Sequence, residues 1–131
     1  MVIVDSDVWS EALRSKREES RSVSALRRLI EEEAVIMIGP IRQEVLSGIR
    51  EVEQYEKIRE IMRSFPSQKL DEPLFELAAS LFNLCRGKGV QGSHSDYLIC
   101  ACAIEWKAQI LTKDEDFKRY AKYIPLELYA E

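Results

Sequence analysis

Residues 1–9 read MVIVDSDVW, and this segment is the first indication of the fold class. Val2–Val4 is a run of β-branched residues without polar alternation, which is the pattern of a strand buried on both faces. Asp5 ends the run, and a helical spacing of apolar residues begins at Val8. A buried strand that leads directly into a helix is typical of α/β proteins, provided that strands and helices go on alternating after it.

The rest of the chain alternates in this way. Further strands are predicted at residues 34–38, 67–70, 110–112 and 124–129. Helices are predicted from apolar spacings of three and four residues at 23–30, 40–52, 55–65, 71–87, 93–107 and 114–123. The helix at 93–107 is nearly all apolar after Asp96, so it should be buried on most sides. The pattern predicts a parallel sheet covered by helices on both faces.

Composition limits the classes of protein to which the chain can belong. It has 131 residues, 46% hydrophobic and 32% charged, with a formal net charge of −4. These values predict one globular domain over residues 1–131. The apolar runs are far shorter than the ~20 residues that a membrane span needs, and no signal-peptide pattern is found, so a cytoplasmic protein without membrane contact is expected. The acidic balance argues against coating nucleic acid through bulk charge but leaves a local site open.

Cysteine and histidine offer little chemistry. Cys85, Cys100 and Cys102 form no C-x-x-C pair and are interpreted as small buried apolar residues. The single histidine, His94, leaves any histidine metal cluster short of ligands. We therefore expect the chemistry to come mainly from carboxylates.

The aspartates are placed differently from the glutamates, most of which are scattered over polar faces of the predicted helices. Only Asp71 is well explained as a plain helix cap. The other five follow a predicted strand or open the buried helix: Asp5, Asp7, Asp96, Asp114 and Asp116. In open parallel sheets, ligand sites lie beyond the carboxyl ends of the strands, where the strand order reverses. Glu44, one turn into the helix after the second strand, would lie near the same edge.

Carboxylates that converge at one edge repel one another unless a cation joins them. An all-oxygen site suits Mg²⁺ or Mn²⁺. Such ions activate water and stabilise charge on a phosphodiester. Capping of helices would account for these acids one by one: Asp5, Asp7, Asp114 and Asp116. Asp96 also fits a capping box with Ser93, and Glu44 could be an ordinary exposed residue. The joint placement favours a shared metal site.

Four motifs resemble the PIN-domain family, and in order and spacing they are most similar to the VapC toxins of bacterial and archaeal toxin–antitoxin pairs. They are VIVDSDVW at 2–9, IRQEVLSG at 41–48, DYLICACA at 96–103 and LTKDEDF at 111–117. The resemblance covers essentially the whole chain. It implies a three-layer α/β/α fold around a parallel sheet of four or five strands, and Mg²⁺- or Mn²⁺-dependent endoribonuclease activity.

The resemblance also implies roles for individual residues. The four catalytic and metal-binding acids would be Asp5, Glu44, Asp96 and Asp114, with Asp5 and Asp96 as the direct ligands. Three further residues would support them: Asp116 as an additional acid, and Ser6 and Thr112 as neighbouring hydroxyls. Asp7 departs from the pattern, since small polar residues are common at that position, and its extra negative charge could alter metal affinity.

The same resemblance implies partners: an RNA substrate, a cognate VapB-like antitoxin and a second copy of the chain in a homodimer. Trp9 and Leu13, as exposed apolar helix positions, are candidates for the dimer surface. Basic residues that could contact RNA, or could equally be solvated surface, are Arg14, Lys16, Arg17, Arg42, Arg86, Lys88 and Lys113.

Two other functions fit parts of the sequence. The first is a phosphatase of the haloacid-dehalogenase type, with Asp5 as nucleophile and Asp7 as acid/base, because D-x-D after a first buried strand is that family's start. It leaves Glu44 and Asp96 without roles. The second is a non-catalytic PIN protein that binds RNA or another protein, against which the retention of all four acids argues.

Overall fold

The computed structural model describes residues 1–14 and 18–131. Its elements follow in the order β1 (Val2–Val4), α1 (Ser6–Arg14), α2 (Arg21–Glu31), β2 (Val35–Ile38), α3 (Gly39–Ser47), α4 (Val52–Met62), β3 (Ser67–Gln68), α5 (Glu72–Gly87), α6 (His94–Trp106), β4 (Gln109–Leu111) and α7 (Asp116–Tyr120). The expected alternation of strands and helices is confirmed. The helix predicted at 40–52 is too long, because α3 ends at Ser47 and Val52 opens α4, where it is 72% exposed.

The four strands form one parallel sheet in the order β3-β2-β1-β4. Ile3 pairs with Ile36 on one side and with Ile110 on the other, so β1 lies in the middle. The strand predicted at 124–129 is reduced to a single parallel bridge between Ile110 and Leu128. Pro125 has no N–H to donate, and the N–H of Leu126 turns back to the carbonyl of Ile124 at 2.8 Å, so the chain is not extended there.

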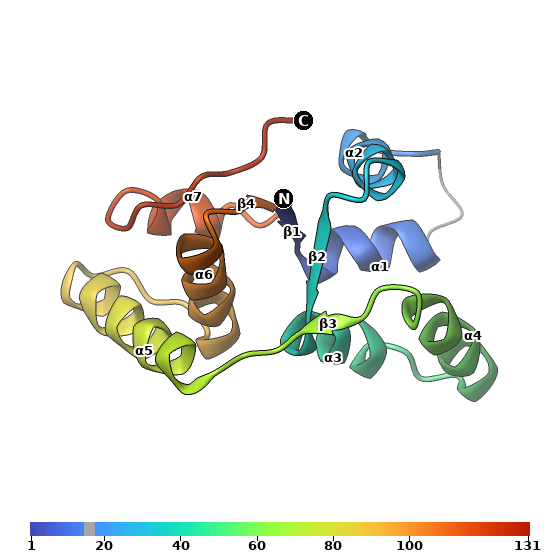
Figure 1. Cartoon of the computed structure of the whole chain (residues 1–131), viewed down its shortest axis with the longest axis horizontal. Coiled ribbons are helices and arrows are strands. Elements are labelled where there is room, and N and C mark those ends of the chain that lie inside the picture. Colours follow the sequence, from blue (N-terminus) through green and yellow to red (C-terminus); the bar gives the residue numbers. More distant parts are fainter. Residues whose placement is uncertain (15–17) are drawn as a thin grey trace.

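Helices cover both faces of this sheet, so the three-layer α/β/α architecture is confirmed. In Figure 1, α5 and α6 lie on one side of the sheet, α1, α2 and α4 lie on the other, and α3 lies beyond the end of β2. The helix α6 is buried on most sides, as its apolar sequence predicted, and all three cysteines are buried. Among the residues that the structure describes, no helix is long and apolar enough to cross a membrane.

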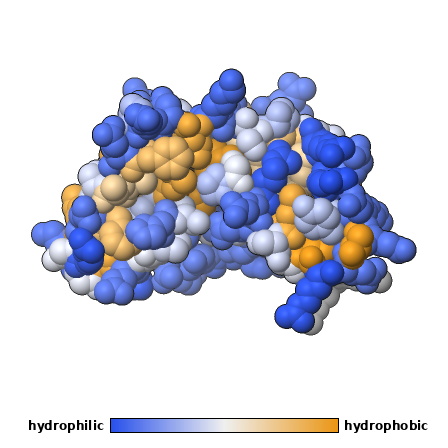
Figure 2. Space-filling view, turned by 90° about the horizontal axis from the view of Figure 1, so that it is seen from below, coloured by the Kyte–Doolittle hydropathy of each residue, from blue (hydrophilic) through white to orange (hydrophobic). Residues whose placement is uncertain are grey.

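The expectation that Trp9 is an exposed residue available to a partner is wrong. Its side chain is 1% exposed and its ring packs edge-on against Phe65, with 5.0 Å between the ring centroids. Large exposed apolar side chains lie elsewhere, among them Phe75 on α5 and Ile61 on α4. Figure 2 shows one apolar area on the side of α5 and a smaller one on the side of α4.

Candidate metal centre

The site lies where the order of the strands reverses. From β1 the chain proceeds through β2 to β3 in one direction, and β4 is then added on the opposite side of β1. Asp5 directly follows β1, and residues 112–116 follow β4. The Asp5 N–H donates to the Leu111 carbonyl at 2.9 Å, which holds the two strand ends together. Such a reversal opens a crevice at the carboxyl ends of a parallel sheet.

Asp5 is a buried carboxylate held by two donors. It is 7% exposed, and its Oδ1 accepts the Ser6 N–H at 2.8 Å while its Oδ2 accepts the Thr112 hydroxyl at 2.7 Å. Burial raises the pKa of Asp5 to about 6, against the effect of these hydrogen bonds. The N–H groups of Val8 and Trp9 bond to the main-chain carbonyl of Asp5, so of the first N–H groups of α1 only that of Ser6 donates to the Asp5 carboxylate.

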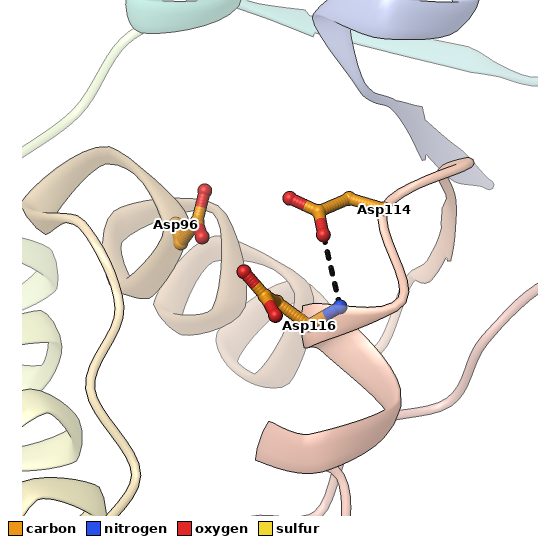
Figure 3. Close-up of side chains that lie close together, drawn as sticks. All are labelled: Asp96, Asp114 and Asp116. Carbon is orange, nitrogen blue, oxygen red and sulfur yellow. Dashed lines mark hydrogen bonds between the residues drawn. The ribbon is translucent and has the colours of Figure 1, made fainter.

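Asp96, Asp114 and Asp116 form the tightest group. One carboxylate oxygen from each lies within 4.8 Å of the others. Figure 3 shows them facing a common space, Asp96 from α6, Asp114 from the loop after β4 and Asp116 from the start of α7. Local hydrogen bonds shape this loop, because Asp114 Oδ1 accepts the Asp116 N–H at 2.9 Å and the Thr112 hydroxyl oxygen accepts the Asp114 N–H at 3.0 Å.

Capping of α6 accounts for the main-chain contact of Asp96 but not for the contact of its carboxylate. Ser93 is the N-cap of α6, and its hydroxyl oxygen accepts the Asp96 N–H at 3.0 Å. The Asp96 carboxylate, in contrast, accepts a hydrogen bond from the Tyr120 hydroxyl at 2.6 Å. Burial raises the pKa of Asp96, and the negative charges of Asp114 and Asp116 add to this effect.

Asp7 and Glu44 contribute charge at the rim. Asp7 Oδ2 accepts the Lys113 N–H at 3.0 Å, whereas its Oδ1 is buried without a hydrogen-bond partner among the described residues. The pKa of Asp7 is raised by burial. The pKa of Glu44, on α3, is raised by burial and then by the negative charges of Asp96 and Asp7, so these two acids and Glu44 interact electrostatically.

These residues fit a hard divalent cation. The donor set is all carboxylate, the type of ligand that Mg²⁺ and Mn²⁺ prefer. One oxygen of Asp7 is buried without a hydrogen-bond partner among the described residues. Burial is the largest cause of the raised pKa values of Asp5, Asp7, Glu44 and Asp96, and neighbouring acids add to it, so a bound cation would compensate charge here. Two of the four expected metal-binding acids, Asp5 and Glu44, are not part of the group within 4.8 Å, whereas Asp116, expected only in support, belongs to it.

Two contributors to the site were not foreseen from the sequence: Tyr120, which donates to Asp96, and Gly92, which lies against the Tyr120 hydroxyl. Tyr120 follows Phe117 by three residues, a spacing that indicates only a core position. The one indication in the sequence is Gly92, directly before the N-cap of α6, because a glycine can mark a close approach of another group. The sequence does not show that this group is Tyr120.

Three of the seven basic residues considered for RNA make contacts within the protein: Arg42, Arg86 and Lys113. Arg42 donates to the main-chain carbonyls of Met62 and Phe65, so it ties α3 to the end of α4. Lys113 pairs with Glu11 at 2.9 Å. Lys16 and Arg17 lie outside the described residues. His94, the first residue of α6, stacks on the Phe82 ring, which Arg86 also overlies.

Comparison with known proteins shows the family to which the chain belongs. The family model for the PIN domain matches residues 2–123. Ribonuclease VapC11 of Mycobacterium tuberculosis is 32% identical to the chain, with 97% of this chain and 96% of that protein aligned. The VapC ribonuclease Mb1587 of Mycobacterium bovis matches to the same extent.

Solved structures share the fold at low sequence identity. FitAcB from Neisseria gonorrhoeae superposes with a TM-score of 0.79 at 20% identity, over 99% of this chain and 97% of that one. VapBC2 from Rickettsia felis, bound to a promoter DNA fragment, gives 0.79 at 16% identity, over 98% of both chains. The parallel sheet, the acids at its reversal point and these similarities together establish that the chain belongs to the PIN domain family.

Proposed function

We propose that the protein is a Mg²⁺- or Mn²⁺-dependent endoribonuclease and the toxin of a VapBC-type toxin–antitoxin pair. The observation that carries the proposal is the cluster of three carboxylates, those of Asp96, Asp114 and Asp116, at the reversal point of a PIN-domain sheet, with Asp5 at the end of the adjoining strand β1. The relatives named VapC ribonuclease, aligned over 97% of the chain, support the choice of RNA as substrate.

We assign a separate role to each of the residues at the site. Asp5 and Asp96 would hold the cation as direct ligands, while Glu44 and Asp114 would act through water or a second ion and Asp116 would add negative charge. Thr112 positions two of these acids at once, because its hydroxyl donates to Asp5 and accepts the Asp114 N–H. The bound divalent cation would supply activation of the attacking water and compensation of the charge that builds on the phosphate.

Cleavage of RNA with and without divalent cation tests the proposal directly. We expect cleavage in Mg²⁺ or Mn²⁺ and none in excess EDTA. A protein that binds RNA without cutting it under any of these conditions would support the non-catalytic alternative. The phosphatase alternative has no support, since the PIN domain model matches residues 2–123.

We also propose that the protein acts with a cognate antitoxin and as a homodimer, within the single domain expected over residues 1–131. Solved relatives of its fold include the toxin–antitoxin complex from Klebsiella pneumoniae, which supports the antitoxin. A bound antitoxin segment would cover the acidic crevice and could present an arginine to its carboxylates. Co-purification with the product of a neighbouring reading frame, followed by loss of cleavage, tests this partner.

Replacing Asp7 with asparagine should change the rate of RNA cleavage only a few-fold. Asp7 Oδ2 accepts the Lys113 N–H, a bond that the asparagine carbonyl can keep, so the loss is one charge at the rim of the site. We expect a shifted Mg²⁺ requirement in a titration of cleavage rate against metal concentration. Complete loss of activity would instead match an acid/base role for Asp7, as in a phosphatase.

The stability of the metal-free protein should fall as the pH rises from 5 to 7.5. The pKa of Asp5 is about 6 in the folded protein, whereas the ordinary value expected for the unfolded chain is 3.8. The folded state therefore binds the proton of this carboxyl more tightly than the unfolded state does. Stability therefore falls as the pH rises above the pKa of the unfolded state and through that of the folded state. From pH 5 to pH 7.5, Asp5 alone should lower the free energy of unfolding by ~1–2 kcal/mol.

Thermal denaturation in EDTA at both pH values measures this effect, and Mn²⁺ should raise the melting temperature more at pH 7.5 than at pH 5. The Asp5→Asn variant is the control, because it lacks the titrating group and should show a smaller loss. Equal or greater stability of the wild type at pH 7.5 would contradict the assignment of an uncompensated buried charge.

A further inference from the structure

We propose that Tyr120 is a positioning residue for the metal centre, whose hydroxyl orients the Asp96 carboxylate toward the cation. This inference rests on the proposed function, because it assigns Asp96 to a metal. It adds a residue outside the acidic set, located in α7 and 24 positions further along the chain.

The contact between the two side chains is short and sheltered. The Tyr120 hydroxyl donates to Asp96 Oδ2 at 2.6 Å, and Tyr120 is fully buried whereas Asp96 is half-buried. A hydrogen bond to one carboxylate oxygen fixes the plane of the group and leaves the second oxygen for a cation. Carboxylates that bind metals are commonly held by such an outer partner.

The tyrosine ring is itself fixed by aromatic neighbours. Its centroid lies 4.8 Å from that of Tyr97 and 5.3 Å from that of Phe117. Tyr120 also follows Asp116 by four residues, so both lie on one face of α7. This short helix therefore brings an acid and a hydroxyl group to Asp96 together.

Gly92 provides the space that the hydroxyl occupies. A Cβ atom at this position would lie 2.1 Å from the Tyr120 hydroxyl oxygen and 2.6 Å from the ring carbon that bears it. Any side chain at residue 92 must displace the ring, which cannot bend away as a flexible side chain would. Glycine is required here by close approach, and the contact between Tyr120 and Asp96 depends on it.

Binding of Mn²⁺ measured by isothermal titration calorimetry at pH 7.5 tests the inference. We expect Tyr120→Phe, which keeps the ring, to bind Mn²⁺ about 10-fold or more weakly than the wild type. Tyr97→Phe is the matched control: it removes a hydroxyl from the same aromatic cluster, where it contacts the Val90 carbonyl at 3.4 Å, and should leave Mn²⁺ affinity unchanged.

Gly92→Ala supplies a second, independent variant, since it displaces the hydroxyl without removing it. It should weaken Mn²⁺ binding alone and add little in the Tyr120→Phe background, because the hydrogen bond is then already absent. Circular dichroism establishes that each variant is folded. A purely structural role would lower the melting temperature without changing the Mn²⁺ affinity.

Wild-type affinity in both Tyr120→Phe and Gly92→Ala, or an equal loss in Tyr97→Phe, would overturn the role of Tyr120 and leave the metal-dependent nuclease standing. A wild-type protein that neither binds Mn²⁺ nor cleaves RNA would overturn the proposed function and this role with it. The two failures are therefore distinguishable in one set of titrations.

Discussion

Replacing Asp96 with asparagine should reduce divalent-dependent RNA cleavage at least ~100-fold, the upper end of what loss of an outer partner costs at a metal site. Asp96 lies in the group of three acids within 4.8 Å and accepts the hydrogen bond from Tyr120. Asparagine keeps the shape of the side chain but removes the charge that a hard cation requires. Cleavage of a labelled RNA over a Mg²⁺ series gives the measurement.

The matched control for this variant is Asp71→Asn. Asp71 is the N-cap of α5, where its carboxylate accepts the Leu74 N–H at 3.3 Å, and asparagine caps helices equally well. This variant also loses one negative charge, but outside the site, so it should cleave RNA as the wild type does. If Asp96→Asn cuts like the wild type, the activity comes from a contaminant and the assignment of the site is wrong.

Replacing Asp5 with asparagine should have two opposite effects. Cleavage should fall at least ~100-fold, because a direct ligand is lost. In EDTA at pH 7.5, however, the free energy of unfolding should rise by ~1–3 kcal/mol. The wild type must keep a carboxyl whose pKa is about 6 ionised inside the protein, and the neutral amide removes that cost.

The surroundings of Asp5 can accept the amide. The Ser6 N–H can donate to the asparagine oxygen, and the Thr112 hydroxyl, which rotates freely, can accept from the new NH₂ group. Chemical denaturation in EDTA at pH 7.5 measures the gain. A variant that is both less stable and fully active would show that Asp5 serves the fold, as a helix cap, and not the site.

The parts of the fold that depend on short segments of sequence were predictable. The run Val2–Val4 is apolar throughout because β1 is an inner strand of the sheet, and α6 is nearly all apolar because it is buried among other elements. Asp71 and Ser93, which the sequence predicts as helix caps, are the N-caps of α5 and α6. The placement of Asp5 and Asp114 beyond strand ends followed from the same pattern.

Predictions that depended on distant packing were less successful. The segment at 124–129 has an apolar composition suited to a strand, yet its main chain turns at Pro125 and pairs only through one bridge. Trp9 lies on a helix among polar residues, and its contact with Phe65 is made across 56 positions of sequence. Local patterns carry no information about such partners.

The amino-acid sequence was enough to predict the alternation of elements, the residues that end the strands and the family, because burial, turn formation and motif spacing are properties of neighbouring residues. The arrangement of the acids follows from packing in three dimensions. Asp116 lies inside the tight group and Asp5 outside it, and Asp96 accepts a hydrogen bond from Tyr120, whose hydroxyl occupies the space beside Gly92. These contacts arise when β4 is added beside β1 and α7 packs against α6, so they depend on distances in space between segments far apart in the chain.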